Sequence, residues 1–243
     1  FKGNEQVPGC PIYQGPFSLR SNHNCILCGN CVKLCENASP AFNLLIPGHE
    51  LWAALNVERV STIFMPVIMG TQLFRGLEYT YLTRTLQNAT HSDWAAYAII
   101  LLVATALSYY FIKIGGQLAF GELKDSSIDK GALFINALIP LAFAFELGYQ
   151  IRPLLERLGH FFPILGRQLG IDLHFLDFAI AAGSSKPWQI LSVVFGLLAS
   201  LIFMNNLVKR HEIAAPAKPR ATYVRRFPVY FLAALYIAKF ILG

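Results

Sequence analysis

Charged residues are scarce in this chain. Asp, Glu, Lys and Arg make up 14% of its 243 residues, whereas a soluble globular domain has about 25%. Hydrophobic residues reach 55%, and the mean hydropathy is +0.47. A span across a membrane needs about 20 mainly apolar residues, and the chain has room for several such runs. The scarcity of charge therefore predicts an integral membrane protein.

Motifs of nucleic-acid binding and of common hydrolases are missing as well. The net charge of +6 comes from Lys and Arg that gather at the ends of apolar segments, where such residues orient membrane spans. There is no phosphate-binding glycine loop, nucleophile elbow or H-E-x-x-H signature. We therefore expect no nucleic-acid partner and none of the chemistries that these motifs mark.

Histidine is absent from every predicted span. The six histidines are His23, His49, His91, His160, His174 and His211, and all lie outside the apolar segments given below. Haem iron is commonly held by histidine, so the sequence argues against a bis-histidine haem inside the membrane within this chain. The C-x-x-C-H attachment signature is also missing, because Val32 follows the C-x-x-C pair.

Cysteine is rare but concentrated. Four of the five cysteines form one C-x2-C-x2-C-x3-C run, which comprises Cys25, Cys28, Cys31 and Cys35. This spacing is typical of the ligands of a bacterial-type ferredoxin cluster, and Gly29 suits a close wrap of backbone around it because it has no Cβ. A zinc site usually has two C-x2–4-C pairs with a longer spacer, and disulfides across such short steps are strained. The run predicts a [4Fe–4S] cluster.

The fifth cysteine, Cys10, leaves two ligand schemes open. In the first, the four cysteines of the run hold one cluster and Cys10 is free. In the second, Cys10 completes the cluster of the first three, and Cys35 serves another cluster, since the last cysteine of such a run can ligate a different cluster. A second cluster would need further ligands from a partner chain or from sequence preceding Phe1.

Five apolar segments follow a polar head. Residues 1–50 predict a cluster segment rich in proline and glycine, and 51–243 a transmembrane helical domain. The predicted spans are 57–82, 94–114, 131–151, 188–208 and 227–242. Between the third and fourth, the helical rhythm of apolar and charged residues over 152–187 predicts amphipathic surface helices, broken near Pro163 and Gly166. The predicted fold is an all-α integral membrane protein.

A few charges fall inside the apolar runs. Arg75 and Glu78 lie three residues apart, so on a helix they share a face and can pair. Glu146 and Lys239 are the others. Such charges are costly in a bilayer and mark a quinone pocket, a proton path or pairing between helices; for Lys239 we favour pairing or snorkelling near the interface.

Lysine and arginine also predict orientation. The loop between the fourth and fifth spans holds Lys209, Arg210, Lys218, Arg220, Arg225 and Arg226, which predicts a cytoplasmic position. Alternation then places the cluster segment on the cytoplasmic side of a bacterial or archaeal inner membrane. A reducing cytosol suits unpaired cysteines.

Residues 9–36 resemble a known family. Gly9-Cys10-Pro11, followed by the cysteine run with Gly29-Asn30 and Val32-Lys33 inside it, is similar to the membrane-bound polyferredoxins of the NapH, NosR and CcoG type. The resemblance implies cytoplasmic [4Fe–4S] clusters and electron transfer between the membrane quinone pool and a redox partner. It carries over Cys25, Cys28, Cys31 and Cys35 as ligands, and Cys10 as a further one. The family typically has two complete motifs and Cys-Pro at the end of the run, whereas here Glu36 follows Cys35.

Two functions are therefore weighed. The first is an electron-transfer subunit of an oxidoreductase complex, which relays electrons between the quinone pool or a membrane partner and the larger enzyme. Membrane lipid, other redox subunits and quinone are its expected partners. The alternative is a membrane anchor or assembly protein whose cluster is structural or senses redox state.

Overall fold

A computed structural model describes most of the chain, and the described residues contain helices but no strand. The described ranges are 10–12, 25–34, 59–77, 80–121, 123, 129–173, 175, 184–210 and 219–242. The chain divides into two compact units, Phe1–Glu50 and Leu51–Gly243, which we describe separately. The first unit has one described helix, α1 (Asn30–Leu34). The helices of the second unit are α3 (Arg59–Leu77), α4 (Tyr81–Thr90), α5 (Asp93–Phe120), α6 (Lys130–Leu169), α7 (Ser185–Arg210) and α8 (Pro219–Leu242).

Three of these helices are long and apolar enough to cross a membrane. Within the described part of the chain they are α5, α6 and α7, which contain the predicted second, third and fourth spans. The predicted first and fifth segments coincide with α3 and α8, which are helical but more polar, because α3 carries Gln72 and Arg75 and α8 carries Arg225 and Arg226. The all-helical prediction is confirmed for the described residues, and the number of five spans stays a prediction.

The outward faces of α5 and α7 are apolar. Large hydrophobic side chains are more than half exposed along both helices, among them Leu102, Val103, Leu107, Tyr110, Phe195, Leu198 and Ile202. A soluble protein rarely leaves so much contiguous apolar surface uncovered, whereas lipid contact is compatible with it. The hydrophobic core instead centres on α6, where Phe134, Leu138, Leu141 and Phe145 are almost completely buried.

The helix break that the sequence predicted near Pro163 and Gly166 is absent. α6 continues without interruption through Pro153 and Pro163 and ends only at Leu169. Gly170 ends it, because its φ of 71° is left-handed and its N–H donates to the Gly166 carbonyl. The amphipathic stretch that we predicted as separate surface helices is therefore, up to Leu169, the continuation of α6.

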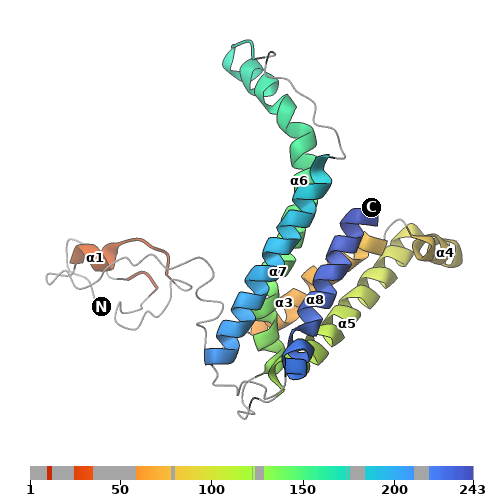
Figure 1. Ribbon diagram of the computed structural model, residues 1–243. Helices are drawn as coiled ribbons and strands as arrows, with labels where there is room; N and C mark the ends of the chain where they lie inside the picture. Colours follow the sequence, from red (N-terminus) through yellow and green to blue (C-terminus); the bar gives the residue numbers. More distant parts are fainter. Residues whose placement is uncertain are drawn as a thin grey trace. The chain divides into compact units, whose positions relative to one another are not determined.

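α6 is longer than the hydrocarbon layer is thick. Its 40 residues span about 60 Å at 1.5 Å per residue, against a layer of about 30 Å. Figure 1 shows its C-terminal part bending away and projecting beyond the other helices. Proline inside a helix removes a hydrogen bond and kinks the axis, so Pro153 and Pro163 account for this bend. We infer that the projecting part lies outside the hydrocarbon layer.

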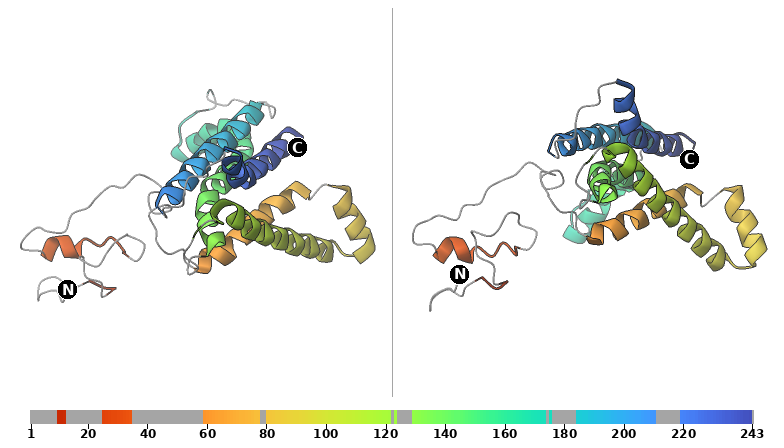
Figure 2. Two further views of the ribbon diagram at one scale, coloured as in Figure 1. Left: turned by 60° about the horizontal axis from the view of Figure 1, so that its bottom comes forward. Right: turned by 90° about the horizontal axis from the view of Figure 1, so that it is seen from below.

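The predicted first span is also shorter than expected. α3 ends at Leu77, and residues 81–90 form the separate helix α4, which the sequence analysis missed. The Thr83 hydroxyl donates to the Leu77 carbonyl at 2.6 Å, which ties the start of α4 to the end of α3. Figure 2 shows α4 between the C-terminal end of α3 and the N-terminal end of α5.

Small residues let α6 and α7 pack closely. A Cβ added to Gly196 of α7 would collide with the Cβ of Ala144 and would lie 3.1 Å from the Pro140 carbonyl oxygen. Two serines of α7 bond across the same contact. The Ser200 hydroxyl accepts from the Leu141 N–H at 3.1 Å, and the Ser192 hydroxyl donates to the Ala144 carbonyl at 3.1 Å. Small residues of this kind hold helices together in lipid, where burial of apolar surface drives no association.

We expect Gly196→Ala and Gly76→Ala to change stability in opposite directions. The methyl of Gly196→Ala overpacks the contact between α6 and α7 and costs about 1–3 kcal/mol. Gly76 of α3 has no atom within 4 Å of an added Cβ, so alanine there stabilises the helix by about 0.5–1 kcal/mol. Denaturant unfolding in detergent micelles measures both, and equal effects of the two substitutions would contradict this packing.

Candidate functional site

The cysteine loop has an unusual backbone. Leu27 adopts φ 54° and Gly29 φ 74°. Glycine reaches this left-handed region freely, but a leucine there is uncommon and costs about 1–2 kcal/mol. Such strained residues cluster at functional sites, and both of these lie between the first and third cysteines of the run.

Backbone N–H groups of the same loop form hydrogen bonds to a cysteine sulfur and to a backbone carbonyl. The Leu27 N–H donates to the Cys25 Sγ at 3.4 Å. The Gly29 carbonyl accepts from the N–H groups of Val32 and Lys33 at 3.0 and 3.1 Å, and these bonds form the start of α1. Turns with N–H groups pointing inward bind anions, iron–sulfur clusters included. An N–H bond to a ligating sulfur also raises the reduction potential of a cluster.

The thiols of the described cysteines are free. Cys28 is exposed, whereas Cys10, Cys25 and Cys31 are half-buried, and none of the four is in a disulfide. Cys35 lies outside the described residues. Among the residues that the structure describes, no three Cys, His, Asp or Glu side chains are grouped closely enough to hold a metal ion. The cluster and its ligand set of Cys25, Cys28, Cys31, Cys35 and Cys10 stay a prediction.

A second polar site lies in the helical unit. The Arg75 Nη1 contacts the Glu146 carboxylate oxygens at 2.7 and 2.8 Å, which joins α3 to α6. The Arg75 guanidinium also lies 4.7 Å from the centre of the Tyr149 ring, a cation–π distance. The two charged side chains are 32% and 37% exposed, so this ion pair is largely shielded within the unit.

Next to this pair, an amide and a phenol are buried together. The Tyr236 hydroxyl of α8 donates to the Gln72 Oε1 at 2.6 Å, and the Gln72 Nε2 donates to the Ala142 carbonyl at 3.0 Å. Gln72 and Tyr236 are each 2% exposed. The Tyr236 ring stacks on Phe145 with centroids 4.1 Å apart. These contacts fasten α3 to both α6 and α8.

The described partner of Arg75 is one that helical spacing does not suggest. Spacing pointed to Glu78, which lies outside the described residues, so that pair stays a prediction, and among the described residues Arg75 pairs with Glu146, 71 positions away. The sequence analysis singled out Glu146 as a charge in an apolar run without finding its partner. It missed Gln72 and Tyr236, whose only signal is a polar side chain in an apolar segment.

A cavity of about 1300 Å³ opens beside this polar group. Gln72, Arg75, Tyr149 and Tyr236 line one side of it, and leucine, isoleucine and valine side chains of α4 and α5 line another. A space of this size accommodates a small molecule or part of a lipid.

No protein-family model, curated protein or solved structure matches the chain. The resemblance to the polyferredoxins therefore stays an expectation drawn from residues 9–36.

We expect Glu146→Gln to destabilise the helical unit more than Glu156→Gln. The first substitution removes the charge that faces Arg75 from another helix. Because both side chains are about a third exposed, the cost is about 1 kcal/mol. Glu156 pairs with Arg152 along one exposed face of α6, at 2.9 Å and with side-chain exposures of 40% and 54%, and such a pair contributes about 0.3–0.5 kcal/mol. Unfolding in detergent measures both, and a larger loss at Glu156 would contradict the assignment.

Proposed function

We propose that the protein is an integral membrane iron–sulfur subunit that relays electrons between the quinone pool, or a membrane redox partner, and a larger oxidoreductase. One observation carries the proposal: a ferredoxin-type cysteine run, with a backbone N–H donating to the Cys25 sulfur, is joined in one chain to helices long enough to cross a membrane. A soluble ferredoxin needs no such helices, and a plain anchor needs no such run.

In this proposal Cys25, Cys28 and Cys31 hold a [4Fe–4S] cluster. Its fourth ligand is Cys35 or, in the second scheme, Cys10. When bound, the cluster supplies one-electron transfer. The chain positions the thiolates, and the Leu27 N–H stabilises negative charge at the Cys25 sulfur. The polyferredoxin resemblance supports the same assignment.

We further propose that α3 and α8 cross the membrane with the three more apolar helices, which gives five spans. Two contacts support this. The charge of Arg75 on α3 is neutralised by Glu146, and the Gln72 amide is bonded within the unit, so these polar groups need no water. The arginines at the start of α8 support a cytoplasmic position for the cluster segment.

We expect the anaerobically purified chain to contain about four irons and four acid-labile sulfides, the content of one cluster. Reduction by dithionite should give one fast-relaxing EPR signal, and addition of a quinol should elicit the same signal. About eight irons with a spin-coupled signal would instead indicate two clusters, completed from outside this chain. Absence of iron, or zinc in its place, would overturn the proposal.

Serine substitutions identify the ligands. Cys25→Ser, Cys28→Ser and Cys31→Ser should each lose most of the iron. Cys35→Ser and Cys10→Ser form a matched pair, because only the variant that lacks the true fourth ligand should lose this cluster. A cluster that binds fully but is not reduced by dithionite or quinol would reject electron transfer and favour the anchor or assembly role.

A further inference from the structure

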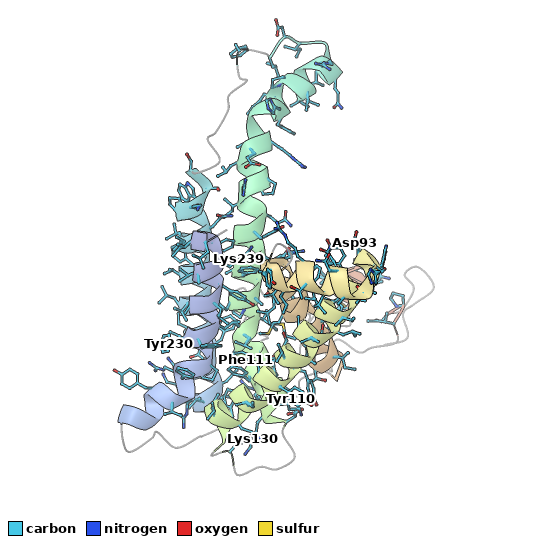
Figure 3. All side chains as sticks on the ribbon, turned by 90° about the vertical axis from the view of Figure 1, so that its right-hand side faces the viewer. Asp93, Tyr110, Phe111, Lys130, Tyr230 and Lys239 are labelled. Carbon is cyan, nitrogen blue, oxygen red and sulfur yellow. The ribbon has the colours of Figure 1, made fainter. Side chains whose placement is uncertain are left out.

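The cavity of the helical unit lies at one end of the bundle. Its lining includes the first residues of α7, Ser185 and Lys186, and the last residues of α8, Lys239 and Leu242. Figure 3 shows Lys239 at about the same level along the bundle as Asp93, whereas Lys130 lies toward the opposite end. The ends of helices that cross a membrane lie near the lipid headgroups. The end of the cavity lined by Lys186 and Lys239, which we call its pole, is therefore near the membrane interface.

The charges at this pole are predominantly positive. Four basic side chains line the cavity, namely Arg75, Arg152, Lys186 and Lys239, with Glu156 as an acidic one. Arg75 is paired with Glu146 and Arg152 with Glu156. The Lys186 Nζ donates to the Ile241 carbonyl at 3.3 Å, and among the described residues neither Lys186 nor Lys239 is in an ion pair. Two lysines therefore line the cavity without a carboxylate partner among the described residues.

The start of α7 adds to this positive field. α7 begins at Ser185, so its first backbone N–H groups lie at the same pole of the cavity as Lys186. A helix N-terminus carries a partial positive charge. The ends of α3 and α8, which also line the cavity, carry the opposite partial charge, so the two lysines are the main groups that favour an anion at this pole.

Part of the cavity lining is an apolar stripe on α5. Ile99, Val103 and Leu107 follow one another at intervals of four residues on one face of α5, over about 12 Å. They are 40%, 53% and 58% exposed, so the protein does not cover them. Leu82 and Leu86 of α4 line the cavity with them. An extended hydrocarbon chain fits such a stripe.

These two features distinguish between amphiphilic ligands. A quinone headgroup is neutral and leaves both ammonium groups without counter-charge. The buried groups best suited to bond its carbonyls, Gln72 and Tyr236, already bond to one another and to Ala142. The headgroup of a zwitterionic lipid carries a cationic group as well as the phosphate, so it neutralises the two lysines less well. A lipid with net negative charge satisfies the lysines and the stripe together.

We propose that this cavity binds an anionic phospholipid, with its phosphate at Lys186 and Lys239 and an acyl chain along Ile99, Val103 and Leu107. Basic pockets between membrane helices are known to hold anionic headgroups. The site joins the start of α7 to the end of α8, so the lipid would brace these helices against α4 and α5. This inference goes beyond the proposed function and does not depend on the cluster.

The test is titration of the full-length chain in detergent micelles with phosphatidylglycerol and phosphatidylcholine, followed by native mass spectrometry. We expect Lys186→Gln with Lys239→Gln to weaken phosphatidylglycerol binding about 30-fold, because each lysine near a lipid headgroup contributes a factor of about five. Lys113→Gln with Lys130→Gln is the matched control. Lys130 also donates to a backbone carbonyl, that of Gly121, and neither lysine lines the cavity. The control should change binding less than twofold.

A second pair of variants tests the apolar stripe. Val103→Trp fills the cavity from an exposed position and should displace the lipid, whereas Leu102→Trp, on the neighbouring position at 70% exposure, does not line the cavity and should not. Equal binding of the two lipids by the unsubstituted chain, equal weakening by both lysine pairs, or displacement of the lipid by a short-chain quinone would overturn the proposal. Iron content, measured in parallel, reports separately on the proposed function.

Discussion

The second unit depends on one constraint, which is that polar side chains on apolar helices must find their partners within the protein. Lipid offers no hydrogen bonds, so an unpaired amide or charge there is costly. On the proposal that α3 crosses the membrane, Gln72 and Arg75 meet this requirement through Ala142 and Glu146 of α6 and Tyr236 of α8. Each of these hydrogen bonds joins particular atoms, so it forms in only one arrangement of the helices. Together they fix the rotation of α3 about its own axis and its position along α6.

The same network separates the interior of the unit from its surface. α6 supplies the buried core and the partners of α3, while Gly196 and two serines bring α7 close to it. The remaining faces of α5 and α7 are apolar and uncovered. The cavity opens beside Tyr236, between residues of α3, α5 and α8 that line it.

Local patterns in the sequence predicted local features well and distant ones poorly. The apolar runs located α5, α7 and the start of α6, because length and composition decide whether a helix suits a membrane. Pro163 and Gly166 suggested a helix end that does not occur, since a long helix tolerates a proline kink and the true stop is the left-handed Gly170. The partner of Arg75 could not be read from spacing, because tertiary packing brings Glu146 to it from another helix. The cysteine run was recognisable because its cysteines are close together in sequence, whereas the role of Cys10 depends on contacts that spacing does not define.

The two units must therefore obtain their stability in different ways. A segment of about 50 residues rarely builds enough apolar core to fold alone, and in the cysteine loop Ile26 and Leu27 are 61% and 58% exposed. The left-handed backbone at Leu27 adds a further cost. On the proposed function, metal–thiolate bonds supply what is missing, because the binding energy of a structural metal centre is also folding energy. Removal of iron should then unfold the cysteine loop and leave the helical unit intact, since the hydrogen bonds and packing of α3, α6 and α8 involve no cysteine.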